Sequence, residues 1–182
     1  MRRFFTHNNQ ALTIEIYLKL SVKSRIMNGL DKVEKFIKDY NVEGEFLRLD
    51  RYTKSSNDAS KAVGIPKNHI VKTIIVIGSD NKPYAILLPG DKKINYDKLK
   101  KILKVRDVKL ASFEVVKNTT GLEPGEVSPF TEEIKGLTCI LDSSVTGKDI
   151  IVVGGGSHYT LIRTKTSEII RTLKPIIAEI SK

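Results

Sequence analysis

The stretch KTIIVIG (Lys72–Gly78) is a short run of mostly β-branched residues that opens on a lysine and ends on a glycine. An apolar run of this length, bounded by turn-forming residues, is typical of a buried strand. The segment SDNKP (Ser79–Pro83) then has turn composition, and YAILL (Tyr84–Leu88) is a second apolar run. The sequence therefore predicts two paired strands at the centre of a sheet.

Helical and strand patterns continue on both sides of this pair. Asn95, Ser112 and Thr166 are expected to cap helices, and Gly64 is expected to end one. The expected elements are helices at 30–40, 55–63, 95–103, 113–118 and 166–173, and further strands at 45–49, 138–141, 150–153, 160–164 and 176–180. This order does not fit a simple βαβ alternation. It predicts a mixed α/β domain with a curved mixed sheet wrapped by helices.

Residues 119–136 show no clear helical or strand pattern. Pro124 and Pro129 lie there, together with Gly121, Gly125 and Gly136. Because irregular stretches of this length inside compact domains are usually functional, we expect part of a binding site in this loop.

The first 26 residues stand apart from the rest. Apolar and polar residues alternate from Leu12 to Val22, which is typical of a strand. Met27 would also be a natural start, so residues 1–26 are either an N-terminal extension or an upstream misassigned start. The domain itself is predicted to cover 27–182.

The composition narrows the choice of partners. The 182 residues carry a formal net charge of +10 and a pI of about 9.6. Such a charge favours nucleic acid as a partner. A composition rich in lysine and isoleucine is also typical of heat-adapted proteins, so the charge alone leaves both interpretations open.

Other features bear on the compartment. Cys139 is the only cysteine, which excludes an intramolecular disulfide and a cysteine-cluster metal site. It lies in an apolar strand and is expected to be a small core residue. No apolar run reaches the ~20 residues that a membrane helix needs, and the basic start lacks the apolar segment of a secretory signal. We therefore predict a cytoplasmic protein without a membrane partner.

Several common chemistries have no signature in this sequence. There is no phosphate-binding P-loop, and the run GGGS (154–157) lies between two expected strands rather than opening a helix. His7, His69 and His158 lack the spacing of a helical zinc site. No nucleophile elbow is present. No metal or cofactor is therefore predicted.

Four short segments together resemble one known family. The first joins AVGIP (62–66) to IVKTI (70–74), and the second is YAILLPGD (84–91). The third is TGLEPGEVSPF (120–130), and the fourth joins LDSS (141–144) to VGGG (153–156). In this order and spacing they are similar to the YbaK/prolyl-tRNA synthetase-associated domain family, whose members edit aminoacyl-tRNA. The resemblance spans about residues 27–182 and implies the fold of that family.

The resemblance also implies a function and a partner. The expected reaction is hydrolysis, in trans, of the ester that joins a wrong amino acid to the terminal ribose of tRNA, with tRNA for proline favoured. Prolyl-tRNA synthetase is a second candidate partner, and the oligomeric state is left open. The alternative is a non-catalytic tRNA- or nucleotide-binding module of the same fold.

Within the resemblance, Lys72 is the family's essential lysine. Taken alone, it would be read as a surface lysine whose stem lies on apolar side chains at the edge of the sheet. In the family context, we expect its ammonium in a cleft, where it can hold the substrate and stabilise developing charge. The other expected substrate-binding residues are Thr73, Gly121, Gly125, Val127, Ser128, Pro129, Gly154 and Gly155.

Two other polar residues near these motifs, Asp142 and His158, are not expected to take part directly in the reaction. Asp142 is expected to cap a turn, and His158 either touches the nucleotide or lies exposed in a loop. No residue is an obvious general base. The resemblance therefore suggests substrate assistance, in which a ribose hydroxyl of the tRNA helps to activate water.

Overall fold

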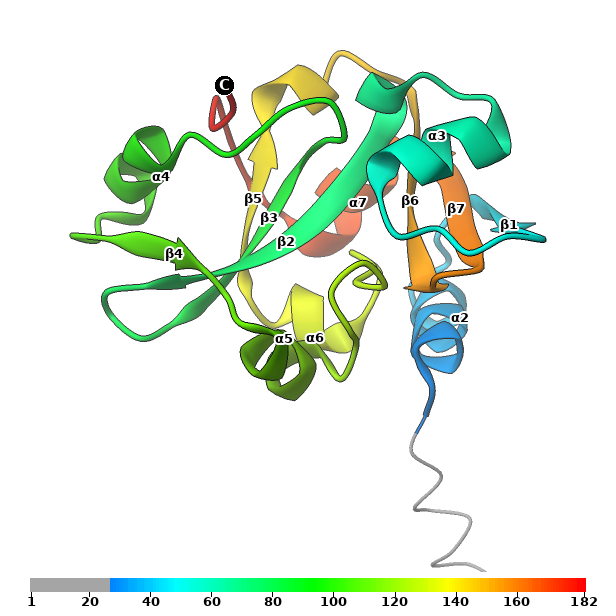
Figure 1. The fold of residues 1–182 in the computed structure, drawn as a ribbon, viewed down its shortest axis with the longest axis horizontal. Helices are drawn as coiled ribbons and strands as arrows, with labels where there is room; N and C mark the ends of the chain where they lie inside the picture. The colour runs from blue at the N-terminus through cyan, green and yellow to red at the C-terminus, as the bar shows by residue number, and fades with distance from the viewer. Residues whose placement is uncertain (1–26) are drawn as a thin grey trace, which may run out of the picture.

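The computed structural model describes residues 27–182, so the predicted extension at 1–26 lies outside the described residues. An eight-stranded sheet has the order β1-β7-β6-β2-β3-β5-β8, with β4 paired to β2 off this path (Figure 1). The strands are β1 (Gly44–Arg48), β2 (Ile70–Gly78), β3 (Pro83–Pro89), β4 (Val108–Leu110), β5 (Thr138–Asp142), β6 (Ile150–Ser157), β7 (Thr160–Lys165) and β8 (Ile176–Ala178). The helices are α2 (Gly29–Asp39), α3 (Ser56–Val63), α4 (Tyr96–Leu103), α5 (Phe113–Thr120), α6 (Glu132–Lys135) and α7 (Thr166–Leu173), with 3-10 turns η1 (Lys67–His69) and η2 (Ser143–Val145).

The predicted central hairpin is confirmed. Strands β2 and β3 pair antiparallel from Val71 opposite Pro89 to Ile77 opposite Pro83. Parallel pairing joins β2 to β6, β3 to β5 and β5 to β8, while β1, β7 and β6 pair antiparallel. The sheet is therefore mixed, and the predicted mixed α/β class is confirmed.

Local capping explains where several helices begin and end. Ser55 and Asp58 form a reciprocal capping box at the start of α3, and Gly64 ends that helix in the left-handed conformation. Asn95 and Ser112 cap α4 and α5 as predicted. The cap predicted at Thr166 is wrong. Thr166 is the first residue of α7, and its hydroxyl donates 2.6 Å to the carbonyl of Lys148.

Other differences involve short elements. Helix α5 runs to Thr120 and α6 occupies 132–135, so the stretch expected to be irregular is shorter than predicted. Strand β4, only three residues long, was not predicted and exists through its pairing with β2. Strand β6 continues through the glycines at 154–156, and β8 ends at Ala178. Elements this short are fixed by their tertiary neighbours rather than by local pattern.

Two layers of helices enclose the sheet. On one face α2, α5, α6 and α7 cover the main core, which includes Val71 and Ile75 of β2. On the other face, α4 packs over one smaller cluster and α3 over another. Figure 1 shows α4 toward one end of the molecule and α3 toward the other, with β2 passing between them. No helix in residues 27–182 is long and apolar enough to span a membrane.

Candidate functional site

Lys72 lies between the two smaller clusters on the α3–α4 face. Because side chains alternate along a strand, Ile70, Lys72, Ile74 and Val76 share one face of β2. Ile70 packs in the cluster under α3, and Ile74 and Val76 pack in the cluster with α4. Strand β2 is interior to the sheet, so Lys72 is not on an edge strand as expected, although residues 72–74 pair with β3 alone in the described sheet. The lysine instead fills the gap between two helices.

Among residues 27–182, the ammonium of Lys72 has a single hydrogen-bond acceptor. Its Nζ donates 2.6 Å to the carbonyl oxygen of Lys92. Across residues 27–182, no carboxylate lies within ion-pair distance of this nitrogen. Burial, followed by the positive charge of Lys67, lowers the pKa of Lys72 below its ordinary value of 10.5, and only Asp91 opposes this shift. A partly buried cation without a carboxylate partner favours a negatively charged ligand.

Beside Lys72, β2 has a partner strand on only one edge. Its pairing with β6 covers Ile70 and Val71, and its pairing with β4 begins at Val76. Between these two contacts, residues 72–74 pair with β3 alone within the described sheet. The buried hydroxyl oxygen of Thr73, in this segment, has no hydrogen-bond partner. An unsatisfied buried polar atom of this kind marks a place where a ligand can bind.

A pocket of about 410 Å³ opens onto this unpaired segment of β2. The start of α3 (residues 55–57) lines a second side of the pocket. A third side, which we call the glycine wall, is formed by Gly125, Val127 and Gly154. The charged lining residues are Lys54, Lys67 and Lys72, with no carboxylate and no histidine among them. The N-terminus of α3 adds the positive end of a helix dipole. The volume suits a small organic group, and the charge suits an anionic one.

Close backbone approach explains the glycines in this wall. Gly125 has φ of +100°, and a Cβ there would lie 2.9 Å from Cε1 of His158. A Cβ on Gly154 would lie 3.0 Å from the carbonyl oxygen of Val127. Neither position leaves room for a side chain without a shift of its neighbours. Five of the nine expected site residues therefore line one pocket: Lys72, Thr73, Gly125, Val127 and Gly154.

Comparison with known proteins identifies the family. Residues 51–172 match the sequence profile described as the aminoacyl-tRNA editing domain. The chain belongs to the aminoacyl-tRNA editing domain family. The matched range contains all nine residues expected in the site.

Related sequences and structures agree with this assignment. The editing domain is 31% identical to proline–tRNA ligase of Geobacter metallireducens over 105 residues, which are 58% of this chain and 18% of the ligase. It is 38% identical to the Lactobacillus acidophilus ligase over 92 residues, 50% of this chain and 16% of the ligase. The chain thus spans less than a fifth of these relatives.

Two crystal structures share the fold with a TM-score of 0.76 each. One is a hypothetical protein, APE2540, at 26% identity, with 83% of this chain and 99% of that chain covered. The other is a candidate trans-editing enzyme for prolyl-tRNA synthetase, at 20% identity, with 86% and 99% covered. The second likeness concerns the fold alone.

The other four expected residues do not line the pocket of the editing domain. Gly121 ends α5 in the left-handed conformation with φ of 70°. The Ser128 hydroxyl is fully buried and accepts from the backbone N–H of Phe130 at 3.2 Å. Pro129 is buried, and Gly155 packs against the backbone of Thr160. Ser128, Pro129 and Gly155 flank the glycine wall, whereas Gly121 lies against the side chain of Lys32.

His158 is buried rather than exposed. Its Nδ1 lies 2.8 Å from the carbonyl oxygen of Thr53, and its ring stacks on Tyr52 with centroids 4.3 Å apart. Because a carbonyl only accepts, Nδ1 carries a proton here. The ring lies behind Gly125, and the lining of the pocket does not include it. His158 thus backs the glycine wall.

Several lining residues could not be found from the sequence pattern. The segment 53–57, Lys67, Gly90 and Leu161 all reach the pocket. The Ser55–Asp58 capping box marks a helix start, but nothing local indicates that this start faces Lys72. A Cβ on Gly90 would lie 2.8 Å from the carbonyl oxygen of Lys67, so this glycine allows the loop after β3 to approach η1.

Two residues of β5 have structural roles, as predicted. Burial raises the pKa of the Cys139 thiol to about 12, which leaves it unreactive. The Asp142 carboxylate caps η2 by accepting from the backbone N–H of Ser144 at 3.1 Å. Among residues 27–182 there is no cluster of three or more histidine, cysteine or acidic residues that could hold a metal.

Proposed function

We propose that this editing domain is an aminoacyl-tRNA deacylase that acts in trans and hydrolyses the ester of mischarged tRNA, with tRNA for proline as the expected carrier. The observation that carries this proposal is the partly buried Lys72 ammonium, which has no carboxylate partner and faces a glycine-walled pocket. The family membership and the similarity to proline–tRNA ligases support both the reaction and the carrier.

The pocket offers two ways to stabilise the reaction. The Lys72 ammonium can neutralise the terminal phosphate or the oxyanion that forms as water attacks the ester carbonyl. The Thr73 hydroxyl, which has no partner among residues 27–182, can bind a polar group of the substrate. The closely packed backbone at Gly125 and Gly154 fits the aminoacyl group tightly without contributing side chains. These groups act by position and charge and need no covalent intermediate.

The base for the attacking water is assigned to the substrate. The lining residues include no histidine and no carboxylate that could accept a proton near neutral pH. The free hydroxyl next to the ester on the terminal ribose is close to the carbonyl by its own chemistry and can orient the water. A mischarged tRNA that lacks this hydroxyl should be cleaved at least ~100-fold more slowly, the usual contribution of general base catalysis. Cleavage at the full rate would contradict substrate assistance.

The same absence of a base gives the second candidate function its support. A pocket with cations and no proton acceptor also suits a module that binds the charged 3′ end without turnover. Measuring amino acid release from a panel of mischarged tRNAs separates the two functions. Turnover on one or more members supports the deacylase. Saturable binding with release no faster than the spontaneous rate on every member supports the binding module.

A further inference from the structure

Positive charge in the described residues is concentrated in one segment. Residues 27–182 contain 26 lysines and arginines against 20 aspartates and glutamates, a net charge of +6. Residues 91–110 comprise α4, β4 and the loops beside them. They contain eight lysines and arginines against three aspartates, a net charge of +5. The other 136 residues are therefore almost neutral as a group.

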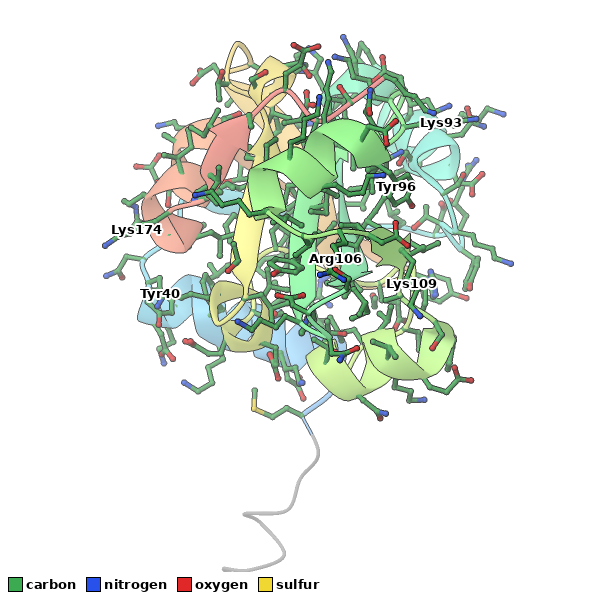
Figure 2. All side chains as sticks on the ribbon, turned by 90° about the vertical axis from the view of Figure 1, so that its left-hand side faces the viewer. Tyr40, Lys93, Tyr96, Arg106, Lys109 and Lys174 are labelled. Atoms are coloured by element: carbon green, nitrogen blue, oxygen red, sulfur yellow. The ribbon has the colours of Figure 1, made fainter. Side chains whose placement is uncertain are left out.

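Five cations of this segment form what we call the α4 surface: Lys93, Lys101, Lys104, Arg106 and Lys109. All five side chains are exposed, and none has an ion-pair partner within residues 27–182. Figure 2 looks onto this surface, with α4 in front. A shallow depression there is lined by Lys100, Lys101, Lys104 and Arg106, with Asp97 as its one acidic residue.

The backbone beneath these cations is held in place. Lys104 ends α4 in the left-handed conformation, and the N–H of Val105 bonds back to the carbonyl of Lys100. Ser79, in the turn after β2, accepts from the N–H of Arg106 through its hydroxyl at 3.1 Å. The backbone N–H of Ser79 donates 2.9 Å to the carbonyl of Asp107. A fixed backbone reduces the entropy lost when an extended ligand binds.

The loop 90–95 joins the pocket, which Gly90 lines, to the α4 surface, which begins at Lys93. The carbonyl oxygen of Lys92 accepts a hydrogen bond from the Lys72 ammonium, and Lys93 is the next residue after Lys92. The loop 90–95 then leads directly into α4, which packs on the face of β2 that also carries Lys72. The opposite face differs in charge. The helices on that face, α2, α5, α6 and α7, hold six cations against seven acidic residues.

We propose that the α4 surface binds the sugar–phosphate backbone of the tRNA acceptor arm while the 3′ end enters the pocket. The proposal rests on the proposed function, because that function brings an acceptor arm to this pocket. Exposed cations with no acidic partner attract the regularly spaced phosphates of an RNA duplex. Such contacts position the RNA and read little sequence, so this surface should bind acceptor arms of different tRNAs similarly.

The test compares two triple variants of the whole chain. The first, Lys101→Gln, Lys104→Gln and Arg106→Gln, removes three charges from the α4 surface. The matched control, Lys38→Gln, Lys135→Gln and Lys174→Gln, removes three exposed charges, likewise without ion-pair partners in residues 27–182, from α2, α6 and the end of α7 on the other face. The probe is a fluorescent uncharged RNA hairpin with a single-stranded CCA 3′ end. Its dissociation constant is measured by anisotropy over a range of salt concentrations.

The α4-surface variant should bind the hairpin at least ~10-fold more weakly at low salt, and its log–log salt slope should shrink by about 2 to 3, close to one per lost phosphate contact. The control should stay near wild type. A charge-conserving variant, Lys101→Arg, Lys104→Arg and Arg106→Lys, should restore binding, which excludes misfolding as the cause.

Equal binding and an unchanged slope in the α4-surface variant would overturn the proposal, as would an equal loss in the control. Because the hairpin carries no ester, its binding does not depend on deacylation. If no mischarged tRNA is cleaved but the α4 surface still binds the hairpin, the surface stands and the proposed reaction fails. If mischarged tRNA is cleaved but the α4-surface variant binds the hairpin as tightly as wild type, the proposed reaction stands and the proposed role of the α4 surface fails.

Discussion

The pocket end of β2 and the C-terminal end of β5 both bury polar side chains, but the two regions satisfy them differently. The fully buried carboxylate of Asp142 accepts from the backbone N–H groups of Ser144 and Ile180, each at 3.1 Å, and from the Ser144 hydroxyl. Lys72 has one carbonyl acceptor, and the Thr73 hydroxyl has none. Buried groups are nearly always hydrogen-bonded in native proteins. Asp142 therefore serves the fold, whereas the groups at β2 keep hydrogen-bonding capacity that residues 27–182 do not use.

The largest expected effect tests the β2 side of this comparison. Lys72→Ala should lower the deacylation rate by about 10²- to 10³-fold, the usual cost of losing one group that stabilises an oxyanion. Its thermal midpoint should stay the same or rise slightly, because the substitution removes a partly buried cation that has no carboxylate partner. Single-turnover kinetics and thermal melting measure the two quantities.

The matched control for that variant is Lys61→Ala, on the exposed side of α3. It should leave both the deacylation rate and the midpoint close to wild type. If Lys72→Ala unfolded the protein, or kept most of the wild-type rate, the lysine would belong with Asp142 among the structural residues.

The next effect tests the β5 side. Asp142→Asn should destabilise the fold by about 2–4 kcal/mol, because an amide cannot accept from all the donors that surround the carboxylate. The rate per folded molecule should change little. Urea unfolding followed by circular dichroism measures the loss. An unchanged midpoint would contradict the structural role.

The contribution of Asp142 should also depend on pH. Burial alone would raise its pKa, but hydrogen bonds, led by that from Ser144, hold the pKa below its ordinary value of 3.8. A carboxyl group with a lowered folded-state pKa stabilises the fold fully above that ordinary value and loses the contribution as the pH falls through the folded-state pKa. The difference in unfolding free energy between wild type and Asp142→Asn should therefore shrink below about pH 4.

A smaller effect is expected in the wall. Gly125→Ala places a Cβ 2.9 Å from Cε1 of His158 at φ of +100°. The strain of about 1–2 kcal/mol should displace the wall and lower kcat/KM by about 10-fold. Gly147→Ala is the control, because a Cβ there would meet nothing within 4 Å and the φ is not positive. Equal kinetics for the two variants would argue against a wall fitted to the substrate.

The smallest effect compares two buried threonines. Thr73→Val should lower kcat/KM by a few-fold and leave stability equal or raised by about 1 kcal/mol, since no hydrogen bond is lost. Thr120→Val should cost about 1–2 kcal/mol, because that hydroxyl donates to Val116 at 2.8 Å and accepts from Leu122 at 3.0 Å. If both variants lost stability equally, the Thr73 hydroxyl would have a partner within the protein.

How much the sequence predicted depended on whether a feature was local. The β2–β3 hairpin and the caps at Asn95 and Ser112 follow from patterns within a few residues. The four-residue helix α6 and the three-residue strand β4 form through tertiary contacts, and no local pattern indicates them.

The site shows the same division. Lys72 would be an ordinary lysine by pattern alone, and only the family motifs indicated its importance. Gly121 and Ser128 share a motif with Gly125, but the fold turns them away from the pocket. The start of α3 reaches Lys72 through packing between distant segments, which no spacing rule in the sequence encodes.

The central claim is that the unsatisfied groups at β2 form a hydrolytic site for aminoacyl-tRNA. The most direct measurement follows the release of amino acid from a panel of mischarged tRNAs, with purified wild-type protein and Lys72→Ala side by side. Wild type should release the amino acid from at least one member, a mischarged tRNA for proline first among them, and Lys72→Ala should release it about 10²- to 10³-fold more slowly. Release by neither protein, or equal release by both, would contradict the account.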